Sequence, residues 1–203
     1  MNRKTLRLVQ LSTLAAITLI LGLTPLGLIP IPFLGFEITI LQIPTIVAAV
    51  MLGPVSGLIM GLVFGGVSFL KAPTAIGLGQ AIYAYNIFYA AVVCIVPRAL
   101  MGLLCGYLST LLKKLKVNNI VTYSISGLLG SLMNTVFFLS LVYLLCNKFL
   151  SEAFSDFLST AGQTLGVYFI FGIGMVNGVA EAVISVILVA AICKVLERYT
   201  VTD

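Results

Sequence analysis

Residues 52–70 read LGPVSGLIMGLVFGGVSFL, an uncharged segment that begins with a Gly-Pro turn. Its length approaches the roughly 20 apolar residues that a helix needs to cross a bilayer. Glycine recurs at every fourth position, namely 53, 57, 61 and 65. Residues four apart share one face of a helix, so the pattern predicts a smooth ridge that lets another backbone approach closely. We expect a membrane helix at about 55–70 whose ridge serves helix packing within the protein.

The composition indicates an integral membrane protein. Of the 203 residues, 61% are hydrophobic and 8% are charged, whereas a soluble domain carries roughly 25% charged residues. At least five stretches reach or approach the length that crosses a bilayer. We predict an all-α fold that forms a single transmembrane domain over residues 1–203. The six predicted transmembrane helices span about 5–23, 37–52, 55–70, 85–112, 120–146 and 165–197.

A proline-rich segment separates the first two predicted helices. Residues 25–36 read PLGLIPIPFLGF and hold three prolines and two glycines, which a regular helix does not tolerate. Non-helical backbone at a membrane must be covered by protein, because lipid offers it no hydrogen bonds. We therefore expect an outer cap loop, or lid, between helices 1 and 2. The connector at 147–164 is more polar and is predicted to hold a short amphipathic helix.

The basic residues predict the orientation of the chain. Cytoplasmic loops are enriched in Lys and Arg, and six helices place both termini on one side. Lys71 and Lys148 then fall on the outer side, where the cap and a solute site would also lie. The other side, predicted to be cytoplasmic, receives Arg3, Lys4, Arg7, Lys113, Lys114, Lys116, Lys194 and Arg198.

Several classes of function are excluded by what the sequence lacks. The net charge of +5 comes from residues at helix ends and does not indicate nucleic-acid binding. Without a Gly-rich phosphate-binding loop, the chain cannot hydrolyse ATP by itself. Without histidine, it has no Ser/His or Cys/His pair and no histidine metal site. The four cysteines are scattered singly and fit no metal spacing. We expect no catalytic residue, no metal and no cofactor.

Polar residues inside the predicted helices are few, and each is a candidate for function. Arg98 follows Pro97 and needs a partner, because an arginine near the bilayer centre costs about 2.5–3.5 kcal/mol on insertion scales. Asn134 lies in the fifth predicted helix, and Asn177 and Glu181 share a face of the sixth. Further polar side chains lie in the second helix and at the mouth of the fourth, namely Gln42, Gln80, Tyr83, Tyr85 and Asn86.

Two interpretations of this polar set remain open. In one, Arg98 and Glu181 form an ion pair that holds two helices together. In the other, the planar guanidinium of Arg98 binds a ligand carboxylate, while Asn134 and Asn177 bind hydroxyl or amide groups. The two are compatible if the ligand and Glu181 share the guanidinium.

Several segments resemble the substrate-binding S components of energy-coupling-factor (ECF) vitamin transporters, and the resemblance covers nearly the whole chain. Four of them are TPLGLIPIP at 24–32, IPTIV at 43–47, LGPVSG at 52–57 and GLVFGGVSF at 61–69. Two more, VPRALMG at 96–102 and GLLGSLMNT at 127–135, resemble the pantothenate-type branch in particular. The resemblance implies that Arg98 and Asn134 contact the ligand and that Phe69 lines the same pocket.

The resemblance implies high-affinity binding of a vitamin, with pantothenate as the expected ligand. The pantothenate-type pattern usually has histidine where this chain has Gln42, and a neutral residue where it has Glu37. S components for pyridoxine, niacin, folate or riboflavin are therefore the alternatives. The residues expected to bind the solute are Arg98, Asn134, Phe69, Asn177, Glu181, Gln42, Tyr85 and Asn86.

The resemblance also implies partners. S components work in the cell membrane of prokaryotes with a transmembrane scaffold, the T component, and two cytoplasmic ATPase subunits. By this resemblance, Ser12, Ala15 and Ala16 on helix 1 would dock on the scaffold. Two other classes compete. A stand-alone secondary carrier would use Glu181 as a proton site, but the chain shows no evident inverted repeat. A purely structural membrane protein would need no cluster of buried polar residues.

Overall fold

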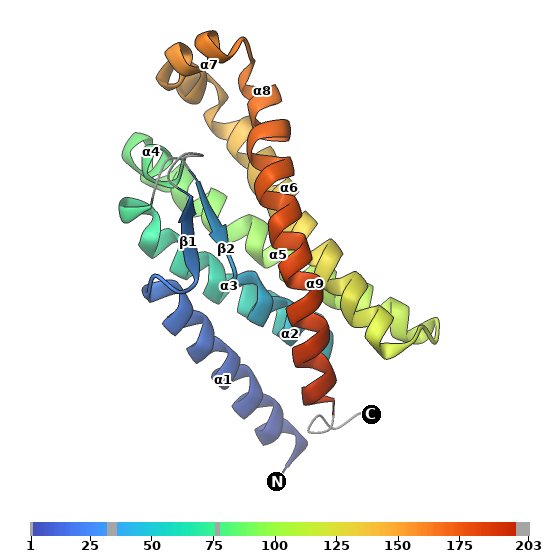
Figure 1. Ribbon diagram of the computed structural model, residues 1–203. Coiled ribbons are helices and arrows are strands. Elements are labelled where there is room, and N and C mark those ends of the chain that lie inside the picture. The colour runs from blue at the N-terminus through green and yellow to red at the C-terminus, as the bar shows by residue number, and fades with distance from the viewer. Residues whose placement is uncertain (1, 32–35, 76–77, 198–203) are drawn as a thin grey trace.

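The computed structural model describes residues 2–31, 36–75 and 78–197, and helices dominate this part of the chain (Figure 1). The long helices are α1 (Arg3–Leu23), α3 (Pro54–Lys71), α5 (Ile87–Lys114), α6 (Asn119–Ala153) and α9 (Val176–Leu196). The shorter helices are α2 (Gln42–Leu52), α4 (Leu78–Tyr85), α7 (Ser155–Ala161) and α8 (Leu165–Val167). A 3-10 turn, η1 (Ala72–Thr74), follows α3, and a π-helical segment, η2 (Tyr168–Met175), joins α8 to α9. Two strands, β1 (Leu28–Ile31) and β2 (Phe36–Thr39), pair as an antiparallel hairpin.

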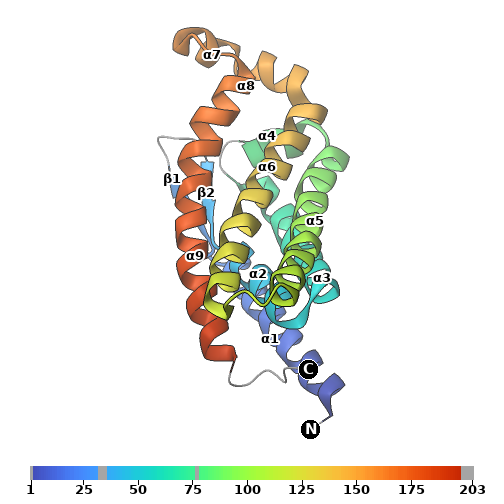
Figure 2. The same cartoon turned by 90° about the vertical axis from the view of Figure 1, so that its right-hand side faces the viewer.

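Within residues 2–31, 36–75 and 78–197, five helical segments are long and apolar enough to cross a membrane. They contain α1, α3, α5, α6 and the continuous run from α8 to α9. The start of α1 and the end of α9 lie at one end of the molecule, which we call the terminal end (Figures 1 and 2). Helices α4 and α7 lie at the opposite end, which we call the cap end. Figure 2 also shows α9, α6 and α5 side by side. The all-helical membrane class predicted from the sequence is confirmed.

The second predicted helix, 37–52, is wrong in its first part. Helix α2 has only 11 residues, which span about 16 Å at 1.5 Å per residue and cannot cross a bilayer alone. Strand β2 precedes it and pairs with β1, with Thr39 opposite Leu28. Residues 38–40 are three consecutive β-branched residues, which have a preference for strands, and the pairing with β1 decides in favour of the strand. The fourth predicted helix, 85–112, corresponds to α5, which begins two residues later at Ile87, and the separate helix α4 precedes it and ends at Tyr85.

The hairpin satisfies its non-helical backbone within the protein, as a membrane requires. The N–H of Ile40 donates to the carbonyl of Gly27 at 3.1 Å. The N–H of Leu41 donates to the hydroxyl of Thr39 at 3.3 Å. The predicted cap loop falls partly on this hairpin, and its residues 32–35 lie outside the described residues. The short helix predicted in the 147–164 connector corresponds to α7.

The glycine ridge of α3 packs against α5, as predicted. A Cβ on Gly57 would overlap the carbonyl of Gly102, and a Cβ on Gly61 would overlap the carbonyl of Arg98. One turn further, a Cβ on Gly65 would lie 2.7 Å from the Cα of Ile95. A Cβ on Gly53 would meet no atom within 4 Å, so the need for glycine there has a different cause. Gly53 has φ of +90° in the turn between α2 and α3, a conformation that disfavours other residues.

Hydrogen bonds from two basic side chains cap the end of α2. The guanidinium of Arg7 on α1 donates to the carbonyl of Leu52 at 2.6 Å and to the hydroxyl of Ser56 at 3.0 Å. The ammonium of Lys113 on α5 donates to the carbonyl of Val50 at 2.6 Å. The last carbonyls of a helix have no partner in the helix and carry partial negative charge, so cations stabilise them.

A second polar contact at the terminal end joins the start of α6 to the end of α9. The carboxylate of Glu197 accepts hydrogen bonds from Lys194, at 3.0 Å, and from Asn119. These two donors lower the pKa of the Glu197 carboxyl from its ordinary value. The contact therefore extends the pH range over which this partly exposed carboxyl is charged to lower pH.

The first prediction concerns the contact between α3 and α5. Replacing Gly61 with alanine should force the two backbones apart and lower the free energy of unfolding by about 1–3 kcal/mol, the usual cost of overpacking. Thermal unfolding of the purified protein measures this. The matched control is Gly66→Ala on the same helix, because no atom lies within 4 Å of a Cβ built there. That variant should be neutral or slightly stabilised by the better helix propensity of alanine. Equal destabilisation of both variants would contradict the assigned contact.

Candidate functional site

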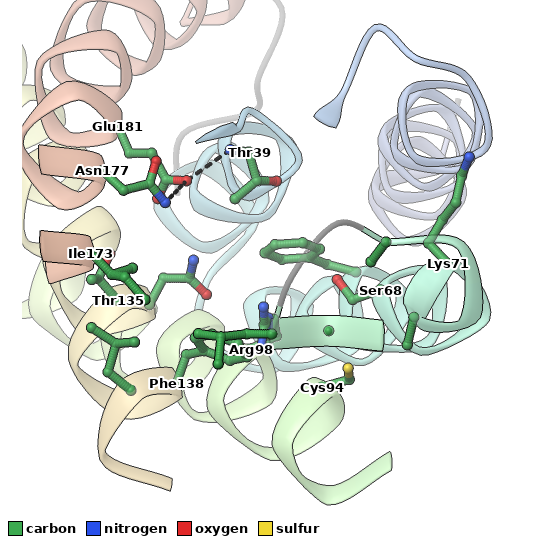
Figure 3. Close-up of a pocket in the computed structure, with 17 residues that line it drawn as sticks. Thr39, Ser68, Lys71, Cys94, Arg98, Thr135, Phe138, Ile173, Asn177 and Glu181 are labelled. Carbon is green, nitrogen blue, oxygen red and sulfur yellow. Dashed lines mark hydrogen bonds between the residues drawn. The ribbon is translucent and has the colours of Figure 1, made fainter. Parts of the chain in front are cut away.

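A cavity of about 140 Å³ lies among β2, α3, α4, α5, α6 and α9, close to the middle of the bundle (Figure 3). Its lining residues come from both hydrophobic clusters of the protein, for example Phe64 from one and Ile173 from the other. Four residues predicted as binding residues line it together: Arg98, Asn134, Asn177 and Glu181. The fold therefore brings polar groups from α5, α6 and α9 to one apolar cavity.

The position of Arg98 follows from the proline beside it. Pro97 has no N–H, so the carbonyl of Val93 loses the hydrogen bond that a regular helix would give it. The guanidinium of Arg98 donates to that carbonyl at 2.8 Å. It also lies between two aromatic rings, 5.4 Å from the centroid of Phe64 and 4.5 Å from that of Phe138. Cation–π contacts of this kind stabilise a desolvated guanidinium.

The guanidinium still has hydrogen-bonding capacity for a ligand. The side chain of Arg98 is 8% exposed, and its Nε has no hydrogen-bond partner among the described residues. The side-chain oxygen of Asn134 is buried and is likewise without a donor in the described chain. Buried polar atoms are nearly always hydrogen-bonded in folded proteins. Unpartnered polar atoms in a cavity lining are available to hydrogen-bond a polar molecule placed there.

Glu181 anchors the hairpin to α9. One carboxylate oxygen, Oε1, accepts a hydrogen bond from the N–H of Thr39 at 2.7 Å and from the amide of Asn177 at 3.3 Å (Figure 3). No ion pair between Glu181 and Arg98 occurs in the described part of the protein. The interpretation in which a direct Arg98–Glu181 pair holds the helices together is therefore not what the structure shows. Each charged group has its own neutral partners.

Four residues predicted to bind the solute do not line the cavity. The amide of Gln42 donates to the hydroxyls of Ser131 and Ser185, at 2.9 and 3.0 Å, and joins α2 to α6 and α9. The other three lie near the cap end: Phe69 packs against Tyr83, Tyr85 stacks on Phe149, and Asn86 caps the start of α5. Their polar or aromatic groups are thus used in packing and capping.

The cavity includes residues that the sequence analysis did not select. On α3, Phe64, Ser68 and Lys71 line one wall. Their spacing of four and three residues places them on one helix face, so this periodicity was the signal that could have identified them. Other unselected lining residues lie one turn from selected ones, namely Cys94, Phe138 and Ile173. Thr39 could not be identified in this way, because it reaches the cavity through the hairpin.

The lining can bind a small polar solute that carries an anionic group. Its ionisable side chains are two cations, Arg98 and Lys71, and one carboxylate, Glu181, apart from the thiol of Cys94. Amides and hydroxyls offer both donors and acceptors. Among the described residues, no group of three His, Cys, Asp or Glu side chains could hold a metal ion.

A family model described as "ECF transporter, substrate-specific component" matches residues 6–193. This range includes all the residues of the cavity. A search of curated proteins finds no match to the chain.

The second prediction concerns the anchor of the hairpin. Glu181→Ala removes the acceptor for the buried N–H of Thr39, and an unsatisfied buried donor costs about 1–3 kcal/mol of stability. Backbone hydrogen exchange at residues 38–42 should therefore accelerate in this variant. Glu181→Gln keeps a side-chain oxygen at the same place and should retain most of the protection. If the glutamine variant exchanges as fast as the alanine variant, the anchor depends on the charge of the carboxylate and not on the hydrogen bond.

Proposed function

The chain belongs to the ECF transporter substrate-specific component family, and on this premise we propose that it is the pantothenate-binding subunit of an ATP-driven importer. Proteins of this family are transport subunits and not enzymes. They work with a T component and with ATPases. The long apolar helices agree with a multi-pass membrane protein. Membership of this family indicates that the ligand is a vitamin-type solute.

The observation that carries the ligand proposal is that the guanidinium of Arg98 is fixed at the cavity with unused hydrogen-bond donor capacity. Its guanidinium is held at the cavity by Val93 and two rings, and its Nε remains without a partner among the described residues. Arginine binds carboxylates through two parallel hydrogen bonds in one plane. A carboxylate at this point would neutralise a charge that has no direct ion pair among the described residues.

The rest of the lining suits the neutral part of pantothenate, which carries an amide and hydroxyl groups. The unpartnered side-chain oxygen of Asn134 can accept a hydrogen bond from a hydroxyl or an amide. The carboxylate of Glu181 has acceptor capacity beyond the two hydrogen bonds it receives on Oε1. Phe64 and Phe138 would cover the aliphatic part of the solute.

Helix α1 offers the surface for the transmembrane partner. Ser12 and Ala16 are exposed, whereas Ala15 is partly exposed and lies at the border of the face on which Thr18 and Gly22 are buried against the protein. Small residues on an exposed helix face let another helix approach closely in a membrane. We assign this face, residues Ser12, Ala15 and Ala16, to docking of the T component.

The orientation proposed for the chain places the terminal end in the cytoplasm and the cap end outside. The terminal end carries Arg7, Lys113 and Lys194, whereas Lys71 and Lys148 belong to the cap end. Excess basic residues favour the cytoplasmic side.

A cysteine introduced in place of Lys148 should react with an impermeant maleimide added to intact cells. If the cysteine reacts only after the cells are permeabilised, residue 148 lies inside and the proposed orientation is wrong.

The next prediction tests Arg98 as the carboxylate contact. Arg98→Lys should weaken pantothenate binding although the charge is kept, because lysine lacks the planar fork. Arg98→Ala should cost at least about 2–5 kcal/mol of binding free energy, the usual scale for one partner of a buried charge pair. Asn134→Ala should cost roughly 1–3 kcal/mol, as expected when a neutral hydrogen bond is lost. Equilibrium binding to the purified protein measures all three.

Thermal stability of each variant must be measured beside affinity, because an unfolded variant says nothing about the site. A folded Arg98→Ala protein with undiminished affinity for pantothenate would refute the assignment. Mass spectrometry of small molecules that co-purify with the wild-type protein tests whether the ligand is a different vitamin. If another vitamin is found, the family function stands and pantothenate is wrong.

The last prediction of this section tests the docking face. Ala16→Trp should abolish uptake in cells, because the bulky ring prevents close helix approach. Binding by the isolated subunit should be unchanged, since Ala16 does not line the cavity. The control is Ile17→Trp, at an exposed position of α1 that lies about 100° around the helix from Ala16. Equal loss of uptake in both variants would show that the docking face is not specific to the small residues.

A further inference from the structure

The part of the cavity lining nearest the cap end carries a second cation that the proposed contact with Arg98 does not use. Lys71 is the last residue of α3, at the cap end, and it lines the cavity together with residues of η1 and α4. Its ammonium group has no hydrogen bond or ion pair to another described residue. A partly buried cation without a partner, at the cap-end part of a binding cavity, is available to an incoming solute.

One face of α3 connects this part of the lining to the deep part of the cavity. Phe64, Ser68 and Lys71 share that face and all line the cavity. The ring of Phe64 lies against the guanidinium of Arg98, 5.4 Å from its centroid. Seven residues of helix separate Phe64 from Lys71, which is a rise of about 10 Å. The two cations therefore lie at different depths along one wall.

The charges along this wall attract anions. Lys71 and Arg98 outweigh Glu181, the one carboxylate among the lining residues, and two neutral donors already bond to that carboxylate. A cleft with low-dielectric walls and one dominant sign of charge focuses the field and accelerates association of ligands of the opposite sign. Figure 3 shows the side chain of Lys71 directed away from Arg98. Because Lys71 ends α3 at the cap end, a solute that enters from that end meets Lys71 before it reaches Arg98.

We propose that Lys71 is a capture residue, which attracts the carboxylate of the solute to the mouth of the cavity and passes it to Arg98. The proposal rests on the proposed function in one respect, namely that the solute is an anion. A residue that acts at the mouth raises the association rate constant and has little effect on dissociation from the deep site. Lys71 would then set the preference of the cavity for anionic over neutral solutes during entry.

Rapid-mixing measurements of pantothenate binding separate these rate constants. We compare the wild-type protein with Lys71→Gln and with the control Lys148→Gln, which removes an exposed lysine of α6 that does not line the cavity. Lys71→Gln should lower the association rate constant about tenfold at low ionic strength, and the difference should shrink as salt is added. The dissociation rate constant should be unchanged. Lys148→Gln should leave both rate constants unchanged.

A second readout does not depend on the identity of the solute. Cys94 lines the cavity one turn before Arg98, whereas Cys105, Cys146 and Cys193 are at most 1% exposed. We compare the rates at which an anionic and a cationic methanethiosulfonate reagent modify the protein, with Cys94→Ala as the blank. The ratio of the anionic to the cationic rate should fall several-fold in Lys71→Gln and not in Lys148→Gln. Taking the ratio cancels any effect of the substitution on the reactivity of the thiol.

The outcomes distinguish this proposal from the proposed function. If the wild-type protein does not bind pantothenate but the reagent ratio falls in Lys71→Gln, the ligand is wrong and the capture role stands. If Lys71→Gln changes neither the association rate constant nor the reagent ratio, the capture role is refuted. A change confined to the dissociation rate constant would also refute it, because Lys71 would then be a contact of the bound solute. An equal change in the rates of the anionic and the cationic reagent would also refute the capture role, because it would indicate an altered opening of the cavity.

Discussion

The backbone contact between α3 and α5 is the constraint on which the rest of the structure depends. Gly57 lies against Gly102, and Gly61 lies against the carbonyl of Arg98. Because Gly61 has no side chain, α3 comes close enough for the ring of Phe64 to contact the guanidinium of Arg98. The same face of α3 continues through Ser68 toward the cap end. The glycine ridge therefore positions one wall of the cavity as well as the helices.

A membrane protein must satisfy its buried polar groups without help from lipid. Here, the groups that interrupt regular secondary structure are satisfied by the candidate site itself. Pro97 releases the carbonyl of Val93, and Arg98 takes it up. The hairpin ends at Thr39, whose N–H bonds to Glu181. Two breaks in regular structure thus hold the two most important charged side chains at the cavity, and neither charge needs the other as a direct partner.

The sequence was sufficient to predict the membrane class, most helix positions and the glycine contact, because these follow from hydropathy and from the spacing of small residues. The sequence was also sufficient to identify Arg98, Asn134, Asn177 and Glu181 as candidate binding residues, since polar residues are rare in apolar helices. It could not predict the strand at Phe36–Thr39, because a short apolar segment is compatible with helix or strand until its pairing partner is known. Gln42 was predicted to bind the solute but does not line the cavity, for a related reason. A buried amide can bond to a solute or to neighbouring helices, and only the structure shows Ser131 and Ser185 within reach.

The hydrogen bonds at the end of α2 have a consequence for how a short helix is fixed at the edge of a membrane protein. Arg7 and Lys113 are exposed and are among the basic residues on which the proposed orientation rests, and in the folded protein both donate to carbonyls of α2. A guanidinium has five N–H donors and an ammonium three, so each can cap a carbonyl and still bond to water or to a lipid phosphate. The same two charges can therefore hold α2 in place and meet the membrane surface.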